Sequence, residues 1–361
     1  MNDSNLTRRA FTSGALLLGL GSKPLLAQGF AGLGRDAANF APVVPGVKLT
    51  FPADHAAHPD YRIEWWYVTA NLSDADGAAC GIQWTLFRQA MATGPQQPGW
   101  ENQQIWMGHA AVTRADTHHS AETYARGGVG QAGVTIRPFH AWIDNWAMQG
   151  GDAMSSATLA PMQLTASGEG FSYALWLDAS QPLVLQGEAG YSKKSERGQA
   201  SYYYSQPYFR ASGTLTVDGR PMQVSGQAWM DREWSSQPLS SDQTGWDWFS
   251  LHLGDAAKLM LFRLRQSNGE NYFSGNWITG DGRSEQIAPD AIKMTPLKTT
   301  EIAGRKLPTT WRIEIASRGL AIETTPLNAR AWMGTSFPYW EGPVFVTGSH
   351  SGAGYLEMTG Y

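Results

Sequence analysis

The stretch GTLTVDGRPMQVSGQAW, residues 213–229, decides the fold class. Apolar and polar side chains alternate on both sides of Asp218-Gly219, and this alternation is typical of half-buried β-strands. An Asp-Gly pair between two such runs favours a type I′ turn, in which both central residues take positive φ. The stretch therefore predicts an antiparallel β-hairpin.

Similar runs recur from about residue 60 to the end, separated by turn pairs such as Asp76-Gly77, Gly254-Asp255 and Asn268-Gly269. Long windows of helical periodicity are hard to find after the first residues. We expect strands at residues 61–72, 81–89, 105–113, 134–141, 171–177, 213–217, 222–229, 247–253, 258–265, 272–278, 311–316, 344–348 and 355–359. Many short strands joined by Gly, Asn and Asp turns indicate an all-β fold, a sandwich or antiparallel barrels.

The chain is longer than one typical domain, which favours two domains. Residues 190–207 are rich in polar and turn residues, and a fresh series of hairpins follows them. Each half also has a Trp-dense strand near its start, at residues 64–67 and 245–248. We therefore predict an N-terminal domain at residues 28–200 and a C-terminal domain at residues 201–361.

The first residues indicate export. Arg8-Arg9 precede an uncharged run at residues 14–21 that is too short to cross a bilayer. The arrangement Thr7-Arg8-Arg9-Ala10-Phe11 resembles the twin-arginine signal of proteins exported folded, with an ordinary secretory signal as the alternative. We expect residues 1–27 to be this signal and the mature protein to be periplasmic or secreted, without a membrane span.

Composition excludes several classes of function. No cluster of Lys and Arg is present, which argues against nucleic acid as a partner. Cys80 is the single cysteine, so an intramolecular disulfide cannot form. Sixteen Trp and thirteen Tyr in a chain with 16% charged residues indicate a large aromatic interior. A β-core explains most of them, and a cavity for carbohydrate or a polyene could explain the remainder.

The common catalytic signatures are missing. The sequence has no Gly-x-Ser-x-Gly elbow, no His-Glu-x-x-His, no phosphate loop and no dinucleotide fingerprint, and we assign no cofactor. His55 and His58 lie three residues apart beside Asp54, but Pro59 limits a helix there. Metal binding would need a third ligand, so we expect a hydrogen-bonded loop and assign no metal site.

Glu64 precedes Trp65-Trp66-Tyr67 in a predicted strand. Alternation places Glu64 and Trp66 on one face and Trp65 and Tyr67 on the other. A carboxylate beside an indole on an inward face is costly unless it is paired or protonated. We take Glu64 and Trp66 as candidate substrate contacts, with an ordinary solvent-facing or indole-binding carboxylate as the alternative.

A second acidic segment, residues 229–234, reads WMDREW. In an extended strand Trp229, Asp231 and Glu233 share one face. Two carboxylates at i and i+2 on an apolar wall repel, so one tends to keep a proton near neutrality. A protonated acid among aromatic rings suits protonation of an alkene, because π-electrons stabilise the carbocation. The alternative is an ion-pair network of Asp231, Arg232 and Glu233 that ties two strands together.

Aromatic residues flank this segment on both sides in the sequence. We predict that Asp231 and Glu233 are catalytic and that they lie in an enclosure without Lys or Arg, which favours an apolar or neutral substrate. The expected substrate contacts of this enclosure are Tyr202, Tyr204, Trp229, Trp234, Trp246 and Asp247, in addition to Glu64 and Trp66.

At these residues the sequence resembles a known family. The matching segments are residues 51–55, 64–67, 185–192, 201–205, 226–234, 245–249, 339–342 and 354–361. They resemble the AttH-like secreted proteins, which belong with the carotenoid 1,2-hydratases and the lipocalin-like Diels–Alderases. The resemblance spans nearly the whole mature chain, and it implies two tandem lipocalin-like antiparallel β-barrel domains.

The carotenoid hydratases add water to an isoprenoid double bond without a cofactor, using an aspartate in a Tyr-x-Asp pattern after a His-x-Trp pair. By chain order the resemblance places Asp231 at the acid, Trp229 at the tyrosine, and Tyr202 and Tyr204 at the earlier pair. Only the aspartate is kept. AttH-like relatives also commonly have Asp-His-Glu-Trp where this chain has Asp231-Arg232-Glu233-Trp234.

Three functions stay open on this basis. The first is acid-catalysed hydration or hydrolysis of a lipophilic, isoprenoid- or polyketide-like molecule. The second is a lipocalin-like carrier, or an accessory that hands a lipid to an envelope ABC transporter. The third is a pericyclic cyclase, in which the shape of the cavity orders a polyene and no acid is needed.

Overall fold

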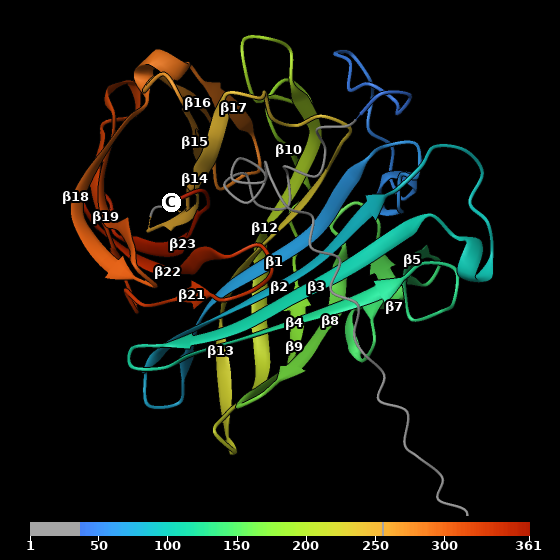
Figure 1. The fold of residues 1–361 in the computed structure, drawn as a ribbon. Coiled ribbons are helices and arrows are strands. Elements are labelled where there is room, and N and C mark those ends of the chain that lie inside the picture. The colour runs from blue at the N-terminus through green and yellow to red at the C-terminus, as the bar shows by residue number, and fades with distance from the viewer. Residues whose placement is uncertain (1–36, 255) are drawn as a thin grey trace, which may run out of the picture.

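The computed structural model describes residues 37–254 and 256–361, and these are almost entirely β-structure (Figure 1). The export signal predicted for residues 1–27 lies outside the described residues. Two large antiparallel sheets account for the named strands, so the all-β prediction is confirmed.

The first sheet has thirteen strands, in the order β4-β3-β2-β1-β13-β12-β9-β8-β7-β6-β5, with β10 and β11 paired to β12. The strands are β1 (Ile63–Asp74), β2 (Ala79–Ala90), β3 (Gln104–Arg114), β4 (His118–Arg126), β5 (Ala132–Ile136), β6 (Phe139–Ile143), β7 (Trp146–Ser155), β8 (Ala160–Gly168), β9 (Phe171–Asp178), β10 (Val184–Leu185), β11 (Tyr191–Lys193), β12 (Ala200–Val217) and β13 (Arg220–Ser235).

The second sheet has ten strands, in the order β17-β16-β15-β14-β23-β22-β20-β19-β18, with β21 paired to β22. The strands are β14 (Gln243–Leu253), β15 (Lys258–Gln266), β16 (Asn271–Ile278), β17 (Ser284–Ile287), β18 (Lys293–Ile302), β19 (Arg305–Ile315), β20 (Leu320–Pro326), β21 (Trp332–Met333), β22 (Tyr339–Gly348) and β23 (Gly352–Met358). This sheet curves into a nearly closed barrel (Figure 1).

Helical structure is limited to short 3-10 turns among the described residues. They are η2 (Ala53–His55), η3 (Gly99–Glu101), η4 (Pro289–Ala291) and η5 (Ala316–Arg318). Within residues 37–254 and 256–361, no helix has the length and apolar character needed to span a bilayer.

The predicted hairpin is β12–β13. Asp218 has φ 48° and Gly219 has φ 76°, so both central residues take the positive φ of a type I′ turn. Strand pairing continues outward from Val217↔Arg220. The local signal of the Asp-Gly pair is therefore confirmed.

The predicted domain boundary at residue 200 does not match the sheet topology. Strands β12 and β13 belong to the first sheet, where they lie between β9 and β1. The sheets divide instead between Ser235 and Gln243. The polar segment near residue 194 is no linker, because β11 pairs with β12 and the Lys194 side chain is buried.

The strand expected at residues 134–141 is also wrong, because it is split. Strands β5 and β6 form a tight hairpin there, and the turn contains Arg137 and Pro138. A proline lacks the N–H that a continuous central strand needs, so the position of Pro138 explains the break.

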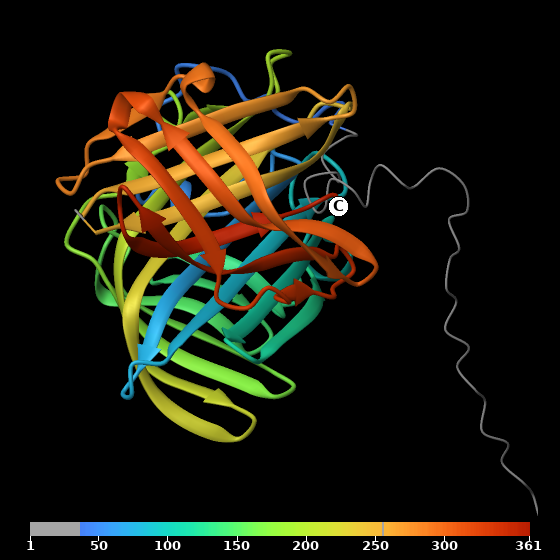
Figure 2. The ribbon, with the colours of Figure 1, turned by 90° about the vertical axis from the view of Figure 1, so that its left-hand side faces the viewer.

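Apolar side chains form three main cores. One fills the hollow of the first sheet and includes Trp66 and Trp84, and another fills the second barrel around Trp311 and Trp340. The third lies between the two sheets and includes Tyr67, Trp229 and Trp248. The second sheet packs against one face of the first (Figure 2), with β23 against β1 and β22 against β2.

The contact between the sheets is close. A Cβ on Gly81 of β2 would collide with the Tyr355 hydroxyl of β23. The Asn71 side chain of β1 donates a hydrogen bond to the Gly354 carbonyl at 2.9 Å. Strand faces that point outward in each sheet alone are therefore buried where the sheets meet, and the candidate site lies there.

Candidate functional site

A cavity of about 110 Å³ lies between the two sheets. Both sheets supply its walls, which are mainly aromatic: Trp65, Tyr67, Phe87, Tyr203, Trp246, Trp248, Phe262, Phe337 and Tyr339. One basic and three acidic side chains also line it, together with His109: Lys194, Asp231, Glu233 and Glu357. An apolar hollow with a few converging polar groups is the usual form of a small-molecule site.

Asp231 of β13 is the most constrained acid in this cavity. Its side chain accepts hydrogen bonds from the Trp229 indole at 2.7 Å and the Ser205 hydroxyl at 2.5 Å, both on Oδ1. The Tyr203 hydroxyl donates to Oδ2 at 2.7 Å. Asp231 is 3% exposed. Burial raises its pKa to about 7, against the lowering effect of the three hydrogen bonds.

The labile proton of Asp231 can be assigned to one of the two carboxyl oxygens. The Trp248 indole lies 3.3 Å from the Tyr203 oxygen and can only donate. Tyr203 therefore accepts from Trp248 and directs its own proton to Oδ2 of Asp231. Because Oδ1 accepts two bonds and Oδ2 accepts one, Oδ2 keeps a free lone pair. That atom can hold a labile proton near neutrality.

Glu233 lies two residues further along the same face of β13. The Lys194 ammonium is 2.7 Å from its Oε1, and the Ser201 hydroxyl donates to the same atom. Lys194 also lies 4.3 Å from the centre of the Phe262 ring and 5.0 Å from that of Tyr203. The expectation of a cavity without Lys or Arg is therefore wrong, since Lys194 lines this cavity.

Glu357 of β23 faces the cavity from the second sheet. It accepts a hydrogen bond from the Trp246 indole at 2.6 Å. Burial raises its pKa to about 7, the indole bond opposes this, and the charges of Asp231 and Glu233 raise it further. Sequence reasoning did not select Glu357, although it is an acidic residue within a buried strand, the same signal that pointed to Glu64.

Trp229 and Trp246 both lie beside Asp231 or its cavity, in different roles. Trp246 lines the cavity, whereas Trp229 is fully buried behind Asp231 and donates to it. The predicted alternation of β13 also holds, because Asp231 and Glu233 share a face. Neither of these two carboxylates pairs with Arg232.

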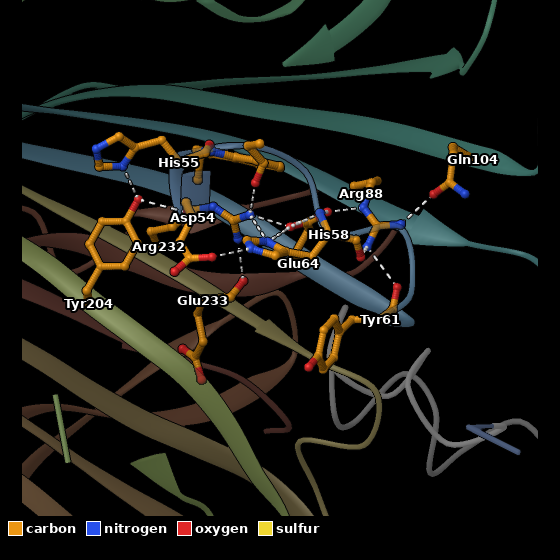
Figure 3. Close-up of polar contacts among 12 residues, drawn as sticks. Asp54, His55, His58, Tyr61, Glu64, Arg88, Gln104, Tyr204, Arg232 and Glu233 are labelled. Carbon is orange, nitrogen blue, oxygen red and sulfur yellow. Dashed lines mark hydrogen bonds and ion pairs between the residues drawn. The ribbon is translucent and has the colours of Figure 1, made fainter. Parts of the chain in front are cut away.

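The other side of β13 faces the interior of the first sheet, and most of the remaining predicted contacts lie there. Figure 3 shows Arg232, Glu64 and Tyr204 of this side. Arg232 bonds to Glu64 of β1, which also pairs with Arg88. The Arg232 guanidinium lies 3.8 Å from the centre of the Trp66 ring. Glu64 and Trp66 therefore belong to a buried ion-pair cluster and do not line the cavity.

Tyr202, Tyr204 and Trp234 share this inner face and are also misplaced in the prediction. Tyr204 bonds to Nδ1 of His55 at 2.7 Å, and Tyr202 donates to the Val44 carbonyl at 3.0 Å. The Trp234 ring stacks on His58 at 4.0 Å. In the run Tyr202-Tyr203-Tyr204 the middle residue faces the cavity, because successive side chains alternate across a strand.

Both histidines of the early cluster are engaged in hydrogen bonds (Figure 3). His58 bonds to Asp54 through Nε2 at 3.2 Å and to Glu64 through Nδ1 at 3.1 Å. His55 bonds through Nε2 to the Ser156 carbonyl at 2.9 Å. No group of three or more His, Cys, Asp or Glu side chains within residues 37–254 and 256–361 is arranged to hold a metal ion.

Asp247 is the last misplaced contact. It lies on the opposite face of β14 from Trp246 and Trp248, inside the second barrel. Arg263 and Arg265 each approach it at 2.7 Å, and the Tyr361 hydroxyl donates to it at 2.6 Å. Asp247 therefore lies inside the second barrel, where the two guanidinium groups neutralise its charge. It does not line the cavity.

The geometry allows one kind of chemistry directly. Asp231 and Glu357 can each exist with or without a proton near neutrality, and aromatic rings surround them. Such groups can protonate an apolar substrate, and the ring faces can stabilise the cation that forms. The Lys194–Glu233 pair adds a fixed dipole and a hydrogen-bond donor.

Comparisons with known proteins agree with this architecture. A family model described as AttH-like matches residues 42–361. A crystal structure described as an AttH protein from Nitrosomonas europaea has a TM-score of 0.78 and 33% identity, covering 89% of this chain and 100% of that chain. The chain matches none of the curated proteins with which it was compared.

Two more distant structures share the fold. Kievitone hydratase from Nectria haematococca has a TM-score of 0.66 and 15% identity, covering 89% of this chain and 96% of that one. CghA, solved with Sch210972, has a TM-score of 0.53 and 13% identity with the same coverage. At these identities the likeness shows the fold alone.

Proposed function

The chain belongs to the AttH-like family, and we propose that it is an enzyme that adds water to a carbon–carbon double bond of a lipophilic molecule. The molecule lies in the cavity between the sheets. Asp231 is the proton donor, and no cofactor takes part. The observation that carries this proposal is a buried carboxyl group, with a pKa of about 7, set among Trp and Tyr rings.

The first step is proton transfer from Oδ2 of Asp231 to one carbon of the double bond. The π-electrons form the new C–H bond, and the other carbon becomes a cation beside the aromatic walls. Donors from Trp229, Tyr203 and Ser205 stabilise the carboxylate that is left. These three hydrogen bonds exist before the proton leaves. They therefore lower the free energy of the carboxylate that forms, and the site does not have to reorganise.

The second step is attack of a water molecule on the cation. Glu233 is held beside Asp231 by Lys194 and Ser201, and its carboxylate orients this water. The water then loses one proton to a carboxylate of the cavity, so the overall reaction consumes no proton. A hydratase among the structures of this fold is consistent with such chemistry.

Lys194 refines the class of substrate. The ammonium has three N–H donors, and one bonds to Glu233. We therefore propose an isoprenoid- or polyketide-like substrate that also carries an oxygen acceptor within reach of Lys194. From the Arg8-Arg9 pattern we propose further that the enzyme works in the periplasm or outside the cell.

The test is turnover of a panel of oxygenated terpenoid and prenylated alkenes in water enriched in ¹⁸O. The wild-type enzyme is expected to yield a product heavier by one labelled water molecule. Asp231→Asn is expected to reduce this rate at least 10²-fold, in the range of lost general acid catalysis. Asp178→Asn, at an exposed aspartate paired with Arg210, is the matched control and is expected to behave as wild type.

Two results contradict the proposal. If Asp231→Asn turns over as fast as the control, then Asp231 is not the acid, and ordering of a polyene by cavity shape explains the activity better. If lipids bind tightly to the wild-type protein and leave with unchanged mass throughout the panel, the protein is a carrier. In that case delivery to an envelope ABC transporter becomes the leading function.

A further inference from the structure

A run of polar side chains leads from the cavity to the protein surface. It begins at Glu357, which lines the cavity. The next group is Glu341, which lies directly opposite Glu357 in the pairing of β22 with β23. Residues directly opposite in an antiparallel pair have Cβ atoms about 4.5–5.5 Å apart. Two carboxyl groups in that arrangement do not both ionise readily when buried.

Glu341 lies behind Glu357 and is 2% exposed. The Tyr67 hydroxyl of β1 donates to its Oε1, while its Oε2 has no hydrogen-bond partner among the described residues. Burial and the charge of Glu357 raise the pKa of Glu341 well above its ordinary value. Glu341 therefore keeps a proton, and its free oxygen can pass one on.

Tyr339 continues the run from the same face of β22. Tyr339 and Glu341 are two residues apart on β22 and therefore share a face of the strand, and the Tyr339 hydroxyl opposes the rise in the pKa of Glu341. The Tyr339 oxygen is 3.0 Å from Nδ1 of His109 on β3, and the two rings stack with centres 5.6 Å apart. This contact joins the second sheet to the first.

His109 leads on to the surface. Its Nε2 is 3.0 Å from Oε1 of Glu122 on β4, and the Glu122 side chain is 18% exposed. Partial burial raises the pKa of Glu122, but bonds from His109 and Ser336 outweigh this and lower it to about 2. An ionised Glu122 can only accept, so His109 carries its proton on Nε2 and accepts from Tyr339 at Nδ1.

We propose that Glu357, Glu341, Tyr339, His109 and Glu122 form a proton relay between the cavity and solvent. This inference rests on the proposed function, because the relay serves the water step. Water that attacks the cation gives its proton to the Glu357 carboxylate. The proton then passes to Glu341, while Glu341 releases its own proton toward Tyr339.

Each later transfer makes one O–H or N–H bond and breaks one. Tyr339 accepts the proton on its oxygen and gives its own to Nδ1 of His109. The imidazolium gives the Nε2 proton to Glu122, which releases it to solvent. Asp231 regains one proton from water that enters the emptied cavity, so the balance over one turnover is zero.

A relay is useful here for a physical reason. An apolar substrate that fills the cavity separates Glu357 from bulk water. Without a path for the proton to solvent, Glu357 would hold the proton that water released, and this would favour the reverse reaction. The run through His109 gives the proton a path that does not require the cavity to open.

These contacts could instead serve only to join the two sheets, and the test separates the two roles. The buried carboxylic acid of Glu341 has an infrared C=O band that shifts when its proton is replaced by deuterium. Rapid transfer of the protein alone into D₂O gives the exchange rate. Glu341→Gln identifies the band.

Tyr339→Phe and Tyr355→Phe are a matched pair for this measurement. Each removes one hydroxyl group at the contact between the sheets, but only Tyr339 lies on the relay. We expect Tyr339→Phe to slow the exchange of the Glu341 band at least tenfold, and Tyr355→Phe to exchange within twofold of wild type. His109→Phe keeps a ring between Phe87 and Tyr339 and is expected to slow exchange equally.

Equal rates in wild type, Tyr339→Phe and His109→Phe would overturn the relay. So would the absence of a band that Glu341→Gln removes, since Glu341 would then hold no proton. If one of these variants does not fold, Glu122→Gln at the surface end gives the same comparison. Turnover in Asp231→Asn tests the proposed catalysis and exchange in Tyr339→Phe tests the relay, so failure of the relay and failure of the proposed catalysis give different results.

Discussion

Replacing Asp231 by asparagine should change the stability of the protein in opposite directions at low and high pH. The ordinary pKa of this carboxyl group, 3.8, is raised to about 7, mainly by burial. Each pH unit across that gap corresponds to about 1.4 kcal/mol. The ionised carboxylate therefore costs the folded state about 4 kcal/mol at pH 8.

The sign follows from proton binding. Between pH 4 and pH 7 the folded state binds a proton that the unfolded state has released, so the free energy of unfolding falls as pH rises. The contribution is fully present below about pH 4 and is lost as pH passes through 7. Asparagine does not titrate, and this slope should be missing in the variant.

The variant also changes one hydrogen bond. Its amide oxygen can still accept from Trp229 and Ser205, but its amide nitrogen faces Tyr203, which must reverse its proton. We take this as a cost of about 1 kcal/mol. Asp231→Asn should therefore be less stable than wild type by about 1 kcal/mol at pH 4 and more stable by about 3 kcal/mol at pH 8.

Urea unfolding followed by tryptophan fluorescence at five pH values from 4 to 8 measures this difference. Asp247→Asn is the control on the neighbouring strand β14, because Asp247 is held between Arg263 and Arg265. Loss of its charge leaves two guanidinium groups without a counter-ion and should cost about 3–5 kcal/mol. A difference between wild type and Asp231→Asn that stays constant from pH 4 to pH 8 would refute the account of a buried neutral acid.

Further predictions concern activity, stability, binding and reactivity. With Asp231 as acid, kcat/KM should fall about tenfold per pH unit above pH 7, and a pH-rate profile that is flat to pH 9 would exclude this. Glu64→Gln leaves Arg88 and Arg232 inadequately paired and should lower the free energy of unfolding in urea by about 3–5 kcal/mol; a loss below 1 kcal/mol would contradict it. Lys194→Met should weaken binding of retinoic acid about tenfold but not that of β-carotene, as measured by tryptophan quenching, and equal effects on both would show that Lys194 contacts no ligand oxygen. Burial raises the pKa of the Cys80 thiol to about 11, so a thiol reagent at pH 8 should label it only in urea, and rapid native labelling would contradict its burial.

Strand type and side-chain parity could be predicted from sequence, because both depend on neighbours within one strand. The Asp218-Gly219 turn, the shared face of Asp231 and Glu233, and the opposite faces of Glu64 and Trp65 all follow from local rules. What parity leaves open is which face meets a cavity. Both faces of β1 and β13 are buried here. The Trp-rich pattern of the sequence is therefore compatible with a cavity on either face of these strands.

The misplaced residues follow from that single ambiguity. Tyr202, Tyr204, Trp66 and Trp234 share parity with one another, and all point into the first sheet. Sequence reasoning placed Tyr202, Tyr204 and Trp234 at the Asp231 site because they flank it along the chain. It selected Trp66 because that residue shares a face with Glu64. A shift of one residue moves a side chain to the opposite face, so Tyr203 and Trp65 line the cavity in their place.

The residues that sequence reasoning missed depend on contacts between distant strands. Glu341 and Glu357 become a pair only through the register of β22 and β23. Lys194 bonds to Glu233 from a segment that the sequence analysis used as the predicted domain boundary. Neither arrangement leaves a trace in local spacing, because register and sheet packing join residues far apart in sequence.

The two faces of β13 have separate roles, and the inner face determines how well the outer face works. Arg232 bonds to Glu64 and to the Ala56 carbonyl, and it lies between the rings of Trp66 and Trp234. A slip of β13 by one residue would break these bonds and bury an uncompensated guanidinium, at a cost of several kcal/mol.

That cost holds Asp231 at its position in the register. A general acid must lie within hydrogen-bonding reach of the reacting atom, and the Tyr203 and Ser205 hydroxyls of β12 reach Asp231 in only one register of β13 against β12. The cluster around Arg232 never reaches the cavity, yet it fixes the strand from behind. Variants of Arg232 should therefore disturb the acid and its proton affinity through position alone, without any contact to the substrate.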